Sequence, residues 1–278
     1  MKSDFTYNEL KIAYVQYGTG TETSICFPGF GRPSEDFKFL QPILKPNQRL
    51  ICVDLFAHGE SIFPATRIMN DPLSKEEWIH FMNAFLLHLK LNTFHLIGYS
   101  MGGRVVLVTM ELMYDRIISV LLIAPDGLKI NPFYRFASGT AIGRKMYHSI
   151  IQNPTRIFAL AKWLNKVGLL TDKLHRFVHV HLDTREKREL VRDAWMIYRK
   201  IFPDKKRIAS LYKSNPISFH MIFGKFDSVI VPQLGQKFAA QLGDKKTLHV
   251  LPMGHRMLGV ELQNYLNDNP SMLSPQII

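Results

Sequence analysis

Short apolar segments separated by amphipathic ones constrain the fold of this 278-residue chain more than any other feature. The apolar segments are continuous rather than alternating, as in strands of a parallel sheet that is covered on both faces. They lie at 24–27, 50–53, 94–97, 120–123, 218–223 and 247–251. Helical periodicity fills the gaps, as at 75–90, and the alternation predicts βαβ units and a mainly parallel sheet.

Local signals place several element ends and the two cysteines. Residues 10–17 alternate well enough to predict a half-exposed strand that ends at Gly18. Ser74 precedes the helical segment 75–90, and Glu77 follows three residues later, which is the pattern of a capping box. Cys26 and Cys52 fall inside predicted buried strands, so we expect free, buried thiols in a reducing compartment.

The middle of the chain departs from this alternation. Four amphipathic segments follow one another without a predicted strand, at roughly 134–151, 154–167, 184–202 and 204–213. We interpret 126–216 as a helical cap inserted into a core formed by 1–125 and 217–278. Residues 126–217 hold 19 Lys and Arg against 7 Asp and Glu, which accounts for the whole net charge of +12. A basic surface of this kind attracts anionic partners.

Composition narrows the class of protein. Hydrophobic content of 46% and charged content of 21% are ordinary for a globular domain. The N-terminal residues lack the apolar stretch of a secretory signal, and no run of about 18 apolar residues is present. We therefore expect a cytoplasmic protein. No nucleic-acid recognition motif accompanies the basic charge, so we expect no nucleic-acid partner.

A G-x-S-x-G motif at 98–102 is the main chemical signal. It follows the predicted strand 94–97 and precedes a helical segment at 104–114. In this strand–turn–helix setting the motif exposes the serine hydroxyl at the end of the strand. The sharp turn places Ser100 in a strained conformation, and Gly98 and Gly102 lack side chains that would collide there. The helix N-terminus then directs N–H groups at developing negative charge.

With these residues the chain resembles the α/β-hydrolase superfamily over roughly 10–128 and 217–266. Residues 28–31 (Pro-Gly-Phe-Gly) resemble the family's oxyanion loop, with Pro28 where histidine is usual. Residues 54–61 resemble its D-x-x-G-x-G-x-S loop, with Ala57 where glycine is commoner. The resemblance implies an α/β fold with a mostly parallel, doubly wound sheet of about eight strands and an inserted all-helical cap.

The resemblance also assigns site residues. Ser100 is the implied nucleophile, Asp227 in the loop 224–232 the acid, and His255 in the loop 252–256 the base. The backbone N–H groups of Phe30 and Met101 are the implied oxyanion hole. This chemistry requires no cofactor and no metal.

Other residues compete for these roles. Asp126 follows the predicted strand 120–123, where some family members place the acid. We expect structural roles for His58 and His95 and a loop-shaping role for Asp54, and Ser100 as a plain turn serine is the alternative to catalysis. Three histidines cluster in the basic segment without the carboxylates or cysteines that would favour a metal site, namely His175, His179 and His181.

Hydrolysis of a carboxylic ester or thioester through an acyl-serine is the favoured function. The alternatives are C–C bond hydrolysis of a diketone by the same triad and a non-catalytic ligand receptor on a hydrolase scaffold. Haloalkane and epoxide hydrolysis are disfavoured, because those reactions use a carboxylate where Ser100 stands. The expected partner is a small-molecule acyl substrate. The basic cap adds an acidic carrier protein, a CoA thioester or an anionic membrane surface as candidate partners.

Overall fold

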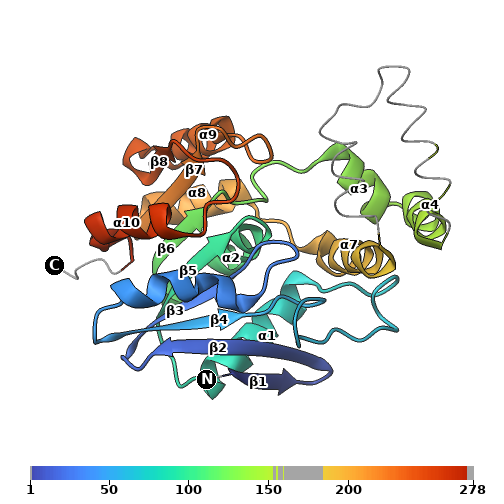
Figure 1. The fold of residues 1–278 in the computed structure, drawn as a ribbon, viewed down its shortest axis with the longest axis horizontal. Coiled ribbons are helices and arrows are strands. Elements are labelled where there is room, and N and C mark those ends of the chain that lie inside the picture. Colours follow the sequence, from blue (N-terminus) through green and yellow to red (C-terminus); the bar gives the residue numbers. More distant parts are fainter. Residues whose placement is uncertain (1, 153–154, 156–158, 160–183, 274–278) are drawn as a thin grey trace. The chain divides into compact units, whose positions relative to one another are not determined.

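The computed structural model describes residues 2–152, 155, 159 and 184–273 (Figure 1). The chain divides into two compact units. Unit 1 comprises Met1–Ile62, Ser74–Lys129 and Ile201–Ile278, and unit 2 comprises Phe63–Leu73 and Ile130–Lys200.

Unit 1 is built on an eight-stranded sheet with the strand order β1-β2-β4-β3-β5-β6-β7-β8 (Figure 1). β2 pairs antiparallel with both β1 and β4, and all other pairs are parallel. The expected mostly parallel sheet is therefore confirmed. The strands are β1 (Lys2–Tyr7), β2 (Leu10–Gly18), β3 (Glu22–Phe27), β4 (Gln48–Val53), β5 (Phe94–Tyr99), β6 (Ile117–Ile123), β7 (Ser218–Gly224) and β8 (Leu248–Leu251).

Helices pack on both faces of this sheet, as a doubly wound fold requires. Neighbouring residues of β3 face opposite ways: Cys26 belongs to a core cluster with residues of η1 and α10, whereas Phe27 meets Trp78 of α1 at 5.9 Å between ring centroids. Both cysteines are free and buried, as expected. The helices of unit 1 are η1 (Ser34–Ile43), α1 (Lys75–His88), α2 (Met101–Met113), η2 (Tyr114–Arg116), α8 (Lys205–Ser214), α9 (Pro232–Leu242), η4 (Lys245–Thr247), α10 (Val260–Asp268) and η5 (Pro270–Met272).

Helix α1 begins where the sequence predicts. The Ser74 side chain accepts a hydrogen bond from the Glu77 backbone N–H at 3.0 Å, which satisfies one of the amides that a helix N-terminus leaves unpaired.

Unit 2 is helical in its described part, with α3 (Pro132–Gly139), α4 (Ala141–Gln152), α7 (Arg185–Ile197) and η3 (Tyr198–Lys200). Its core gathers around Trp195, whose ring lies 5.1 Å from that of Tyr134 and 5.4 Å from that of Tyr147. The Arg199 guanidinium donates hydrogen bonds to two carbonyl oxygens of the segment 63–73, which ties that segment into unit 2.

The division into units differs from the expected cap, 126–216, at three places. Residues 126–129 belong to unit 1. Helix α8 belongs to unit 1, because its buried side chains pack beside α2 and α9. Residues 63–73, which we expected in the core, belong to unit 2. Two further expectations lie outside the described residues apart from positions 155 and 159. They are the helix at 154–167 and the histidine cluster of His175, His179 and His181.

The described helices include none with the length and apolar character that a membrane span requires.

Candidate active site

Ser100 lies between β5 and α2 in a conformation that few residues other than glycine adopt, with φ 50° and ψ −116°. Its backbone is held on both sides, because its N–H donates to the Ile123 carbonyl at 3.0 Å and its carbonyl accepts from the Asp126 N–H at 2.8 Å. The turn also requires a glycine at position 102. A Cβ on Gly102 would lie 1.9 Å from the Phe27 carbonyl oxygen. The fold therefore presents the Ser100 side chain at the carboxyl end of the sheet.

His255 faces this serine from the loop after β8. The distance between Ser100 Oγ and His255 Nε2 is 3.1 Å, a hydrogen bond across 155 residues of sequence. Tyr99 supports the loop, because its hydroxyl donates to the His255 carbonyl at 2.9 Å. Sequence analysis did not identify Tyr99. Its position beside Ser100 in the motif is the one signal it carries, and the contact itself depends on the fold.

Asp227 completes the arrangement from the loop after β7. Its Oδ2 lies 2.7 Å from His255 Nδ1, and its Oδ1 accepts backbone N–H groups of Val229 at 2.7 Å and Ile230 at 2.9 Å. Burial alone would raise the pKa of Asp227, but the hydrogen bonds from His255 and the two amides outweigh it and lower that pKa. An ionised carboxylate at this place favours the tautomer with hydrogen on Nδ1, which leaves Nε2 free to accept the Ser100 proton.

The segment that contains Phe30 passes close to Ser100. A Cβ on Gly29 would lie 3.3 Å from the Ser100 Cβ, so the backbone runs directly beside the serine. Phe30 follows directly, and Met101 is the first residue of α2. The structure thus brings the two residues expected to supply oxyanion-hole N–H groups into the neighbourhood of one hydroxyl.

His58 holds this segment in place. Its Nε2 accepts the Gly31 N–H at 2.8 Å, and its Nδ1 lies 3.1 Å from the Phe56 carbonyl. These partners require hydrogen on Nδ1 and a lone pair on Nε2. Burial lowers the pKa of His58, which keeps the imidazole neutral and able to accept. The ring also meets Phe30 edge-on at 5.6 Å.

Asp54 shapes the neighbouring loop. Its Oδ1 accepts the Ser34 N–H at 2.7 Å, and its carbonyl accepts the Ser61 hydroxyl at 2.7 Å. Ala57 has φ 68°, which is why glycine is commoner at that place in the related motif.

Asp126 and His95 contact residues other than His255. Asp126 Oδ2 is 3.4 Å from Arg104 Nε, and its Oδ1 accepts the Gly127 N–H at 2.7 Å. His95 Nδ1 is 2.7 Å from the Ser119 hydroxyl inside the sheet. Of the two candidate acids, the fold brings Asp227 to His255. Within the described residues, no group of three His, Cys, Asp or Glu side chains is arranged to hold a metal ion.

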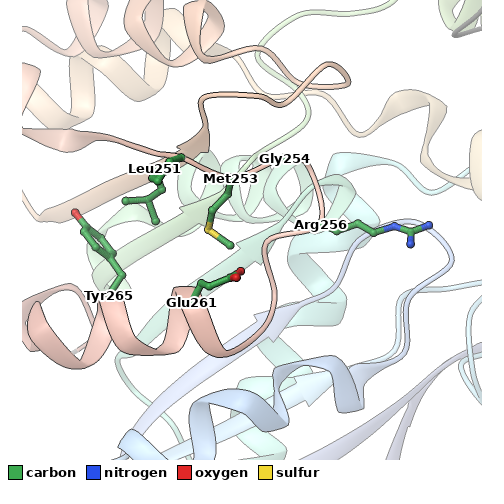
Figure 2. A pocket seen from close by; sticks show the side chains of 7 residues that line it. Leu251, Met253, Gly254, Arg256, Glu261 and Tyr265 are labelled. Atoms are coloured by element: carbon green, nitrogen blue, oxygen red, sulfur yellow. The ribbon is translucent and has the colours of Figure 1, made fainter.

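A groove of about 530 Å³ lies behind the His255 loop (Figure 2). Leu251 and Met253 line it from the strand end and the loop, and Glu261 and Tyr265 line it from α10. Neither Ser100 nor His255 contributes to its wall. The groove is therefore separate from the space in front of the serine hydroxyl.

The sequence profile of the alpha/beta hydrolase fold family matches residues 25–261, most of the chain. The chain therefore belongs to the α/β-hydrolase fold family. A putative lipase from Acinetobacter baumannii has a similar structure, with a TM-score of 0.64, 16% identity, and coverage of 99% of this chain and 92% of that one. At this identity the likeness concerns the fold alone.

Curated relatives match over shorter stretches. A dihydrolipoyllysine-residue acetyltransferase component of the acetoin cleaving system from Pseudomonas putida is 37% identical over 111 residues, 40% of this chain and 29% of that protein. A monoacylglycerol lipase from Rattus norvegicus is 34% identical over 110 residues, 39% of this chain and 32% of that protein. The chain thus aligns with about a third of the length of these relatives. The family therefore gives the fold, and neither the activity nor the substrate follows from these partial matches.

Proposed function

We propose that this protein is a serine hydrolase that cleaves a carboxylic ester or thioester through an acyl-serine intermediate. The observation that carries the proposal is the continuous pair of hydrogen bonds from Ser100 Oγ to His255 (3.1 Å) and from His255 to Asp227 (2.7 Å). A serine hydroxyl is a weak nucleophile unless an adjacent base removes its proton. In this proposal His255 is that base, and the Asp227 carboxylate orients it.

In the first half-reaction Ser100 Oγ attacks the substrate carbonyl carbon while His255 Nε2 takes the hydroxyl proton. The carbonyl oxygen gains the electron pair of the C=O bond, and the backbone N–H groups of Met101 and Phe30 stabilise that negative charge. Collapse of the tetrahedral intermediate breaks the bond to the leaving alcohol or thiol, which receives the proton from His255. Asp227 stabilises the imidazolium that exists between these proton transfers.

In the second half-reaction water replaces the leaving group. His255 takes a proton from water, the resulting hydroxide attacks the acyl carbon, and the acid product departs as the proton returns to Ser100 Oγ. Every proton that leaves one group arrives at another named group, so the cycle needs no further reactant. Each oxyanion donor contributes about 2.7–4 kcal/mol to such a reaction.

The proposed substrate class rests on a partly matching relative and on the identity of the nucleophile. The partly matching monoacylglycerol lipase favours an ester with an apolar acyl group. Ser100 itself argues against haloalkane and epoxide hydrolysis, which require a carboxylate at this position.

The test is a substrate panel with purified protein. Wild type and Ser100→Ala are compared on acyl esters of increasing chain length, acyl-CoA thioesters and a diketone, with the exposed Ser210→Ala as a matched control. We expect ester or thioester turnover that Ser100→Ala abolishes and Ser210→Ala retains. Turnover of the diketone alone would replace the proposal with C–C bond hydrolysis. Saturable binding of a panel compound without turnover would replace it with a receptor.

A further inference from the structure

The basic charge of unit 2 is concentrated where acidic residues are missing. Between Ile130 and Thr171 of unit 2 the sequence contains six Lys and Arg and no Asp or Glu. The described helices α3 and α4 both fall within this stretch. Because no carboxylate is near in sequence to offset these cations, this part of unit 2 favours an anionic partner.

The same two helices expose large apolar side chains. On α3, Phe133 is 54% and Phe136 is 45% exposed, three residues apart, and on α4, Ile142 is 69% and Met146 is 53% exposed, four residues apart. These spacings place each pair on one face of its helix. We call these four side chains the apolar stripe.

The apolar stripe borders the core of unit 2, because the Phe133 ring meets the Trp195 ring edge-on with 6.2 Å between the ring centroids. The buried side of α3 carries Tyr134 and Ala137, and the buried side of α4 carries Tyr147. Each helix therefore has one apolar face that packs internally and a second that is exposed to solvent. Exposed apolar groups gathered in this way mark interaction sites in folded proteins.

Cations border the apolar stripe. Arg135 precedes Phe136 and Lys145 precedes Met146, and both basic residues are exposed. Arg144 joins the two helices, because its guanidinium donates to the Ser138 and Gly139 carbonyl oxygens at the end of α3. The surface thus combines apolar side chains with cations over two helices held together.

From this combination we infer that α3 and α4 form a docking surface for an anionic lipid membrane. At a bilayer interface the apolar stripe can insert among the acyl chains, and Arg135 and Lys145 can contact the phosphate groups of the lipids. A CoA moiety would meet the cations but would leave large side chains such as Ile142 in water. The inference does not depend on the chemistry at Ser100.

Vesicle co-sedimentation of the full chain tests this surface. The probes are phosphatidylcholine vesicles with and without phosphatidylglycerol. The variants are Phe133→Ser/Phe136→Ser and Arg135→Glu/Lys145→Glu. The matched controls change exposed residues of unit 1, Leu87→Ser on α1 and Lys237→Glu on α9.

We expect wild type to bind the anionic vesicles, and each double variant to bind about tenfold more weakly or worse. Both controls should bind like wild type, and high salt should weaken binding by screening. No binding to anionic vesicles, or controls that lose as much as the double variants, would overturn the inference. Thermal unfolding checks that the variants fold, and the charge-reversal pair decides the question if the Phe pair does not. Vesicle binding by a protein that hydrolyses no ester would contradict the proposed function alone.

Discussion

At the residue scale, the two oxygens of the Asp227 carboxylate have different partners and different roles. Oδ1 is fixed by the amides of Val229 and Ile230, so that Oδ2 points at His255 without depending on the histidine for its orientation. A carboxylate anchored in this way stays ionised to a pH below the ordinary range of an aspartate, because its pKa is lowered.

Replacing Asp227 by Asn tests this arrangement. The amide can donate to Nδ1 of His255, which favours the tautomer with hydrogen on Nε2 and removes the acceptor for the Ser100 proton. We expect kcat for ester hydrolysis to fall by about 10⁴-fold. Asp126→Asn is the matched control, since Asp126 pairs with Arg104, and it should retain kcat within tenfold. Comparable losses in both variants would contradict the assignment of Asp227.

His58 is expected to act as a positioning residue for Phe30. His58→Phe keeps a ring but removes the acceptor for the Gly31 N–H, so the segment with the Phe30 amide loses its anchor. We expect kcat to fall about 10²-fold with KM nearly unchanged, because a misplaced oxyanion donor affects the transition state alone. His58→Gln, whose amide oxygen can accept the same N–H, should recover part of the loss. A change confined to KM would show that His58 contributes to substrate binding instead.

At the scale of elements, the turn between β5 and α2 is the tightest part of the site. Gly102 packs against the Phe27 carbonyl with no room for a methyl group. Gly102→Ala should lower the free energy of unfolding by about 3 kcal/mol or more, measured by urea denaturation, because backbone must move to admit the added carbon. Gly254→Ala, where a Cβ would meet nothing within 4 Å, should be nearly neutral. Equal stability of the two variants would contradict the tight packing described for the turn.

The predicted strands agree with the observed ones where the sequence has a continuous run of apolar residues. The segment 50–53 lies within β4 and 120–123 within β6, and the errors are at the ends, where the strands continue through polar residues such as Gln48 and Ser119. β1 was missed because Lys2–Tyr7 carries polar residues in an alternating, half-exposed pattern at the edge of the sheet. Helix α8 was assigned to the cap because periodicity shows that a helix has an apolar face but not what that face packs against.

In the candidate site too, the sequence locates residues but does not predict which distant segments contact one another. The G-x-S-x-G motif between a strand and a helix locates Ser100 in sequence, and Asp227 and His255 follow from the resemblance of their loops to those of the α/β-hydrolases. The contacts of His58 with Gly31 and of Tyr99 with the His255 carbonyl link distant segments. No local pattern encodes such contacts, so they emerge from the folded structure.

At the scale of the whole molecule, buried histidines link stability to pH. Burial lowers the pKa values of His58, His95, His220 and His249 below the ordinary value of 6.5, and His220 and His249 also share a hydrogen bond of 3.1 Å. Between the lowered and the ordinary pKa the unfolded chain binds more protons than the folded one. Stability is therefore complete above about pH 6.5 and falls as pH decreases through the lowered values.

We expect the Tm to be nearly constant from pH 7.5 to about pH 6.5 and to drop from there to pH 5.5, measured by differential scanning fluorimetry at constant ionic strength. His249→Gln should make the drop smaller, because it removes one of these groups and the repulsion that a second charge would exert on His220. A Tm that is constant or rises over this interval would contradict the pKa directions given for the four histidines.

The central claim is that Ser100 is an activated nucleophile, and a fluorophosphonate probe tests it most directly. The probe forms a covalent adduct with activated serines, and peptide mass spectrometry locates the adduct. We predict labelling at Ser100 in wild type, none in Ser100→Ala and none at Ser100 in His255→Ala. Absence of an adduct at Ser100 in folded wild-type protein, or unchanged labelling in His255→Ala, would contradict the account.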